Sequence, residues 1–140
     1  MQFMMILNHQ LRQPIETVVA YLTDFQKYQS IHPLITKVEA LPDGTYRIHE
    51  RFLSSPLMFT YPATITSDEL DKTVEMKATI MQFIKVTMTF KFVGTHSGTS
   101  VVEEIDIRAP FPIRFLMEPI FRKAHTLLFK NLDALKNDRE

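Results

Sequence analysis

Two glutamates stand where the sequence pattern predicts apolar side chains. In the stretch YRIHERF at residues 46–52, strand alternation places Glu50 on the same face as Tyr46 and Ile48. The later stretch SVVEEIDIRAP repeats this anomaly, because Glu103 falls on its apolar face. An ionised carboxylate in an apolar interior must raise its pKa, find a cationic or hydrogen-bonding partner, or lie in a water-filled space.

An inward carboxylate can serve more than one kind of site. In an apolar pocket, Glu50 or Glu103 would act as a polar anchor that binds a ligand hydroxyl or amine. In an enzyme, either one would act as a general acid or base, assisted by Tyr61 or a histidine. The structural alternative is a β-bulge that turns one or both outward, or a position near a solvated strand end. The pattern alone leaves these alternatives open.

The histidines are the other candidates for chemistry. His32 lies beside Pro33 in a break between helical segments, where it either caps a loop or lines a pocket mouth. His125 shares a helix face with Phe121, which favours a buried structural histidine, and His9 lies on a strand of ambiguous facing. No two histidines have the spacing of a metal-ligand motif, so we expect no metal site.

Composition excludes several classes of function. The chain has no cysteine, and its three glycines lie in predicted turns, so it offers neither a thiol nucleophile nor a glycine-rich phosphate loop. We expect no cofactor. Sixteen Lys and Arg residues balance sixteen Asp and Glu residues, which gives no net positive field for binding nucleic acid.

Length predicts one domain spanning residues 1–140, and a cytoplasmic location is the default expectation. A chain of about 150 residues buries roughly 70% of its unfolded surface, enough for a genuine core. The start MQFMMILNHQ has no basic segment typical of a signal peptide, and no stretch approaches the ~20 apolar residues of a membrane span. The sequence does not predict the oligomeric state.

Two helical regions and a series of strands must position the candidate residues. Pro14 and the apolar spacing after it predict a helix over 14–27, and a short second helical turn ends before Pro33. A long C-terminal helix is expected over 119–136, with Pro119 either beginning its main body or kinking it. Period-two alternation between turn-forming residues predicts strands at 2–11, 36–41, 45–53, 57–66, 72–80, 83–93 and 99–109.

These elements predict an α+β architecture with an internal cavity. Short connections favour antiparallel pairing, and seven strands make a sheet roughly 34 Å wide. One C-terminal helix about 27 Å long covers such a sheet only if the sheet curls around it. We expect the cavity between sheet and helix to be lined by apolar side chains with two polar anchors. The predicted lining comprises Phe59, Tyr61, Met76, Met88, Phe90, Ile105, Phe121, His125 and Leu128, with Glu50 and Glu103 as the anchors.

The order of elements resembles the START/polyketide-cyclase (SRPBCC) superfamily. The segment QPIETVVAYLTDFQKYQSIHPLITKVEAL is similar to the opening motif of that superfamily, and the stretch SGTSVVEEIDI is similar to its Gly-Thr turn and last strand. The chain has no tryptophan where many relatives place one, and no feature selects a subfamily. The positions that carry the resemblance are Pro14, Val18, Val19, Leu22, Asp24, Tyr28, Gly98 and Thr99.

The resemblance implies a helix-grip fold, in which a curved seven-stranded antiparallel sheet wraps around a long C-terminal helix. It also implies that the first and last strands are neighbours and that the cavity binds a hydrophobic molecule. Members bind lipids, sterols, polyketides or quinones, and a minority catalyse cyclisation or dehydration. The leading hypothesis is therefore a binding or carrier protein for a small hydrophobic ligand. The alternatives are a polyketide cyclase or dehydratase-type enzyme and a protein-interaction module with a closed core.

Overall fold

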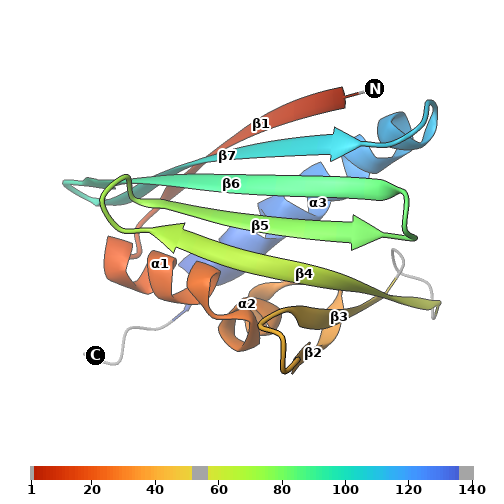
Figure 1. The fold of residues 1–140 in the computed structure, drawn as a ribbon. Helices are drawn as coiled ribbons and strands as arrows, with labels where there is room; N and C mark the ends of the chain where they lie inside the picture. Colours follow the sequence, from red (N-terminus) through yellow and green to blue (C-terminus); the bar gives the residue numbers. More distant parts are fainter. Residues whose placement is uncertain (1, 52–56, 136–140) are drawn as a thin grey trace.

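In the computed structural model, an antiparallel sheet wraps partway around a long C-terminal helix (Figure 1). The structure describes residues 2–51 and 57–135. In chain order the elements are β1 (Gln2–Leu11), α1 (Ile15–Thr23), α2 (Phe25–Ile31), β2 (Ile35–Ala40), β3 (Tyr46–Arg51), β4 (Met58–Asp68), β5 (Thr73–Ile80), β6 (Ile84–Thr95), β7 (Gly98–Arg108) and α3 (Ile113–Asp133).

The described strands form one seven-stranded sheet in the order β1-β7-β6-β5-β4-β3-β2. Each neighbouring pair is antiparallel, and the first and last strands lie side by side. The predicted α+β helix-grip fold is therefore confirmed. The predicted strands agree with the observed ones to within about two residues at each end, and positions 52–53 of the strand expected over 45–53 lie outside the described residues.

The single helix expected over 14–27 is wrong, because the structure divides it at Asp24 into α1 and α2. Asp24 has an extended backbone, and its side chain accepts hydrogen bonds from the N–H groups of Gln26, at 2.8 Å, and Lys27, at 3.3 Å. An aspartate side chain that satisfies free N–H groups at a helix start stabilises a new helix there. The helical spacing of apolar residues continues through both segments and hides this break.

The C-terminal helix starts at Ile113, earlier than expected, so Pro119 lies inside α3. The preceding turn begins the helix: the N–H of Ile113 bonds the carbonyl of Pro110, at 2.8 Å, and the N–H of Phe115 bonds that of Pro112, at 3.0 Å. A proline within a helix lacks one backbone hydrogen bond but does not end the helix here. The described part of α3 ends at Asp133, and residue 136 of the expected helix lies outside the described residues.

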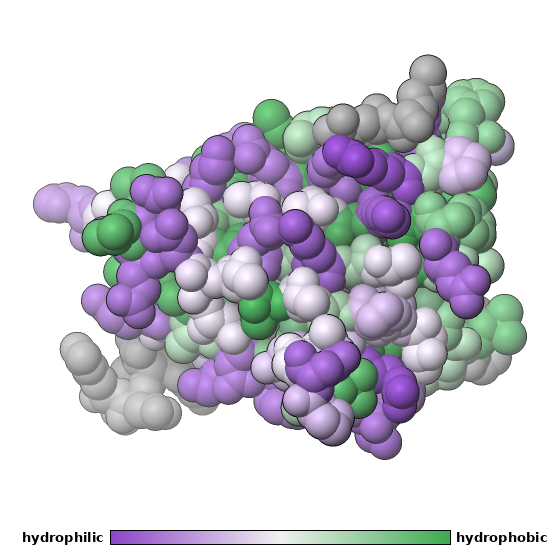
Figure 2. Space-filling view, in the orientation of Figure 1, coloured by the Kyte–Doolittle hydropathy of each residue, from purple (hydrophilic) through white to green (hydrophobic). Residues whose placement is uncertain are grey.

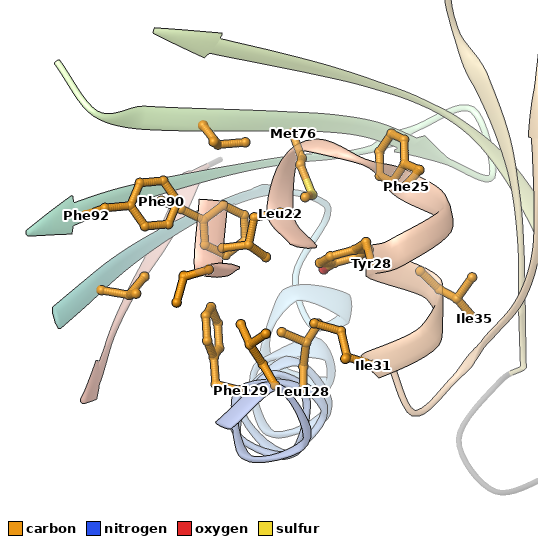
Figure 3. Close-up of a cluster of buried hydrophobic side chains, with 14 of the residues drawn as sticks. Leu22, Phe25, Tyr28, Ile31, Ile35, Met76, Phe90, Phe92, Leu128 and Phe129 are labelled. Carbon is orange, nitrogen blue, oxygen red and sulfur yellow. The ribbon is translucent and has the colours of Figure 1, made fainter. Parts of the chain in front are cut away.

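The main core lies between the inner face of the sheet and the three helices, as Figure 3 shows. Val74 and Met76 of β5 and Phe90 of β6 are buried there against Leu128 of α3, as the strand alternation predicts. Fully burying a large apolar side chain contributes about 1.5–3 kcal/mol to the free energy of unfolding. This packing holds the inner face of the sheet close to α3 along part of its length.

Polar contacts fix the end of α3 against the junction between β1 and α1. The Gln13 side chain donates hydrogen bonds to the carbonyls of Leu132, at 3.2 Å, and Leu135, at 2.7 Å. The backbone N–H of Arg12 donates to the Asp133 carboxylate at 2.7 Å. These contacts close one end of the space between sheet and helix. In the described part of the chain, none of the helices combines the length and apolar character that a bilayer span requires.

Candidate ligand-binding site

A cavity of about 540 Å³ lies between the sheet, α2 and the first half of α3. Its walls are mainly apolar, with side chains from β3 to β6 on one side and from α3 on the other. A volume of this size lies in the range of about 300–1,000 Å³ typical of small-molecule sites. Seven of the described lining residues are polar: Arg51 and Lys77 are exposed, and the interior ones are Tyr28, His32, Glu50, Tyr61 and His125.

The mouth of the cavity is formed by exposed apolar side chains. Leu57, Met58, Met81, Phe83 and Leu116 all line the cavity and are 49–68% exposed. They come from the start of β4, the turn between β5 and β6, and the start of α3. Figure 2 shows green side chains gathered at the right-hand side of the molecule, where Figure 1 places the β5–β6 turn and the start of α3. This end lies opposite the closed end of α3.

Glu50 lines the cavity, as its position in the strand alternation predicts. The sheet contains a bulge beside it, between Ile35 and Lys37, but the extra residue belongs to β2 and leaves the alternation of β3 intact. The hydroxyl of Tyr61 on neighbouring β4 donates a hydrogen bond of 2.6 Å to Glu50 Oε1. Burial raises the pKa of the Glu50 carboxyl, and the hydrogen bond from Tyr61 offsets only part of this increase.

Glu103 is fully buried but lies behind the cavity wall. One carboxylate oxygen forms an ion pair with Nδ1 of His125, and the other lies 3.3 Å from Nε2 of His9. Burial raises the pKa of Glu103, but the charge of His125 and the hydrogen bonds from His125 and His9 outweigh it and lower the pKa overall. Glu103 is therefore an ionised residue that supports the wall of the cavity.

Two histidines from different elements meet at the inner end of the cavity. The rings of His32, after α2, and His125, on α3, are perpendicular with centroids 5.9 Å apart. The His32 Nδ1 accepts hydrogen bonds from the N–H groups of Leu34, at 3.1 Å, and Ile35, at 3.3 Å. Burial and, after it, the charge of His125 lower the pKa of His32 well below its usual value. His32 is therefore neutral, with its proton on Nε2.

Tyr28 contributes a buried hydroxyl to the same end of the cavity. Its side chain extends from α2 into the interior (Figure 3) and is 2% exposed. Burial, followed by the nearby carboxylates of Glu103 and Glu50, raises the pKa of Tyr28 well above its usual value. Within the described residues its hydroxyl has no hydrogen-bond partner. A buried hydroxyl without a partner costs about 1–3 kcal/mol.

The structure divides the predicted lining residues into two groups. One group faces the cavity and comprises Glu50, Phe59, Tyr61, Met76, Met88, Phe121 and His125. The other is buried outside the cavity lining and comprises Phe90, Glu103, Ile105 and Leu128. Alternation identifies the inward face of a strand, but it does not show where along the strand a helix packs directly onto it.

Sequence reasoning did not include Tyr28 among the site residues, and it left His32 open between a loop cap and the lining of a pocket mouth. Tyr28 entered only as an aromatic position in the resemblance, and its burial among apolar residues of α2 resembles that of an ordinary core residue. The one available signal for His32 was its place beside Pro33, in the break between the helical segments.

Solved structures share this fold at low sequence identity. Ara h 8.0201 has a TM-score of 0.72 at 14% identity, over 95% of this chain and 96% of that one. The ZhuI aromatase/cyclase from a Streptomyces species has a TM-score of 0.78 at 15% identity, over 94% of this chain and 92% of that one. TTHA0849 from Thermus thermophilus has a TM-score of 0.69 at 16% identity, over 95% of this chain and 94% of that one. No curated protein sequence matches the chain significantly.

A protein-family comparison extends the likeness from fold to family. Residues 9–138 match the family model described as polyketide cyclase / dehydrase and lipid transport. This match covers both the cavity-lining strands and the helix that closes the cavity. The chain belongs to the polyketide cyclase/dehydrase and lipid transport family, within the START-like (SRPBCC) superfamily.

Proposed function

We propose that the protein binds or carries a small hydrophobic molecule, such as a lipid, polyketide or quinone, in its internal cavity. The observation that carries this proposal is the continuous apolar path from the exposed mouth to the inner polar groups. An apolar ligand that enters there removes its own surface and that of the mouth from water, which favours binding. An open cavity of about 540 Å³ argues against the alternative of an interaction module with a closed core.

Glu50 is the proposed polar anchor for this ligand. Its carboxylate lies in the wall of an otherwise apolar cavity, and Tyr61 holds one oxygen at 2.6 Å. The remaining acceptor positions of the carboxylate suit a hydroxyl or amine hydrogen of a ligand. Such a bond orients the polar end of the molecule inward and leaves its apolar part along the walls.

Native mass spectrometry of the freshly purified protein is the first test. A co-purified apolar molecule, released by organic extraction, supports carriage and identifies the ligand class. The extracted protein is then titrated with N-phenyl-1-naphthylamine, an apolar fluorescent amine. If no molecule co-purifies and the probe shows no saturable binding, the proposed function is wrong.

A cavity-filling variant shows where the probe binds. Ala78 lines the cavity from β5, so Ala78→Leu reduces the space and is expected to weaken probe binding about tenfold. Thr66→Leu adds a similar apolar side chain at an exposed position of β4 and serves as the matched control. Equal affinities of the two variants would place the probe outside the cavity.

Catalysis of the cyclase or dehydratase type is the second candidate function. The observation that favours it is the carboxyl group of Glu50, which faces the cavity and accepts a hydrogen bond from Tyr61. Burial raises the pKa of this carboxyl group. A carboxyl with a raised pKa holds a proton more readily than an ordinary glutamate and can return it during a reaction. With a soluble poly-β-ketone as substrate, Glu50→Gln is expected to abolish turnover and to preserve the fold. Undiminished turnover would exclude Glu50 as the acid or base.

A further inference from the structure

The cavity mouth is part of a larger exposed apolar surface, which we call the mouth face. Phe111 and Phe115, just before and within the first turn of α3, extend this surface beyond the residues that line the cavity. The start of β4, the β5–β6 turn and the start of α3 contribute to it, and all three reach the same end of the sheet (Figure 1). Exposed apolar side chains gathered in this way mark a surface that contacts a protein or a membrane. Those of the mouth face are each 49–68% exposed and comprise Leu57, Met58, Met81, Phe83, Phe111, Phe115 and Leu116.

Basic side chains surround the mouth face. Arg51 at the end of β3, Lys85 near the start of β6 and Arg108 at the end of β7 are all exposed at this end of the sheet. The mouth face therefore combines apolar side chains with positive charge. No acidic residue occurs in the described stretches that carry it, which are residues 57–60, 81–86 and 107–117.

The turns at the opposite end of the sheet are acidic. Asp43 lies in the β2–β3 turn, and Glu69 and Asp71 lie in the β4–β5 turn, where Lys72 is the one basic residue. The whole chain has no net charge, so its positive and negative charges are separated along the strands. An anionic surface would attract the mouth face and repel the opposite end, which orients the molecule.

Arg114 packs between the aromatic side chains at the start of α3. Its guanidinium carbon lies 5.8 Å from the ring centroid of Phe111 and 5.4 Å from that of Phe115. The two rings are edge to face, with centroids 5.2 Å apart. Aromatic rings favour the boundary between lipid head groups and acyl chains, and a guanidinium group beside them can bind a lipid phosphate.

We propose that the mouth face docks the protein on the surface of an anionic lipid bilayer, with the cavity mouth against the lipid. A bilayer accepts apolar side chains from separate segments without a matching shape, and its phosphates complement the surrounding basic residues. Docking goes beyond ligand binding, because the exposed side chains meet the bilayer whether or not the cavity is occupied. An apolar ligand would then pass between bilayer and cavity without crossing water.

Vesicle flotation tests the choice of surface. The vesicles contain phosphatidylcholine alone or phosphatidylcholine mixed with phosphatidylglycerol, which is anionic. The protein is expected to bind the mixed vesicles about tenfold or more tightly, and high salt should reduce this difference. Equal binding to both kinds of vesicle, or binding to neither, would overturn the proposal and leave a protein partner as the occupant of the mouth face.

The chain contains no tryptophan, so a single introduced one reports which end meets the lipid. Phe83→Trp places it in the mouth face, and Leu70→Trp places it in the acidic β4–β5 turn, where Leu70 is 95% exposed. On mixed vesicles that contain a brominated phosphatidylcholine, Phe83→Trp emission is expected to shift to shorter wavelength and to be strongly quenched. Leu70→Trp emission should not change. Equal quenching of the two variants would show that the protein does not dock through the mouth face.

Matched substitutions separate the apolar and the charged contributions. Leu116→Ser in the mouth face is expected to weaken binding to mixed vesicles about tenfold, and Leu70→Ser should have no effect. Lys85→Gln is expected to weaken it about fivefold, and Lys130→Gln, at an exposed position near the end of α3, should have little effect. All four positions are exposed, so the fold is expected to remain intact. Equal effects within either pair would contradict docking through this face.

Ala78→Leu distinguishes failure of docking from failure of the proposed function. It reduces the cavity and leaves the mouth face exposed, so vesicle binding should equal that of the wild type while binding of N-phenyl-1-naphthylamine, measured without vesicles, falls. A parallel loss of vesicle binding would show that lipid is held in the cavity and not at the mouth face. If the wild type binds the probe but no vesicles, the proposed function stands and docking alone is wrong.

Discussion

His125 separates Glu103 from the cavity, because its Nδ1 faces the buried carboxylate while its ring forms part of the cavity wall. Two glutamates share the anomalous place in the strand pattern, yet they have different surroundings. Glu50 faces the cavity and hydrogen-bonds Tyr61, whereas Glu103 acts through histidines. Glu103 is therefore a positioning residue, which holds the orientation of the His125 ring.

Glu103→Gln is expected to lower the free energy of unfolding by about 3 kcal/mol, because it removes one partner of a buried ion pair. Urea denaturation monitored by circular dichroism measures this loss. Glu104→Gln is the matched control, since Glu104 forms a 3.2 Å ion pair with Lys91 that is partly exposed and contributes at most about 1 kcal/mol. Equal losses in the two variants would show that burial of the Glu103 pair has no special effect.

The lowered pKa of His32 predicts a loss of stability on mild acidification. In the unfolded chain a histidine binds its proton near pH 6.5, whereas folded His32 binds it only at lower pH. Between these values the unfolded state holds more protons, so stability falls with decreasing pH by up to about 1.4 kcal/mol per pH unit. Unfolding experiments between pH 7 and pH 5 should show a shallower pH dependence for His32→Asn than for wild type.

His96→Asn provides the control for this measurement, because His96 is an exposed histidine in the turn between β6 and β7. Its pH dependence is expected to follow that of the wild-type protein. If His32→Asn also follows the wild type, His32 does not titrate differently in the folded state.

Gly98→Ala is expected to destabilise the protein by about 3 kcal/mol or more. Gly98 has a φ of +154°, and an added Cβ would lie 1.9 Å from the carbonyl oxygen of Leu11, a backbone atom. An added Cβ at Gly94 meets nothing within 4 Å, so Gly94→Ala should change stability by less than about 1 kcal/mol. Thermal unfolding of the two variants compares them, and similar midpoints would contradict the close approach at Gly98.

Much of the fold could be predicted because alternation and turn residues act locally. Alternation placed Glu50 on the inward face of β3, where the structure has it. The neighbouring bulge does not change the facing of Glu50, because the extra residue of the bulge lies in β2. The break at Asp24 was not predicted, since capping depends on one side chain that accepts two backbone N–H groups. Apolar periodicity carries no information about such a bond.

The candidate site was less predictable because it depends on contacts between distant segments. Glu103 pairs with His9 and His125, which come from opposite ends of the chain. Phe90 has the same strand facing as Met88, but it packs against Phe129, with ring centroids 6.1 Å apart, and Met88 lines the cavity. Neither difference is present in the local sequence pattern.

The hydrogen bonds from Gln13 to the end of α3 have a consequence for the order of folding. Gln13 bonds the carbonyls of Leu132 and Leu135, 119 and 122 residues further along the chain. During synthesis β1 emerges first, but neither its partner β7 nor the end of α3 exists until most of the chain has been made. Pairing over such distances slows folding. The apolar inner faces of the strands can therefore be covered by α3 only late in synthesis, and the cavity can enclose a ligand only after α3 has been made.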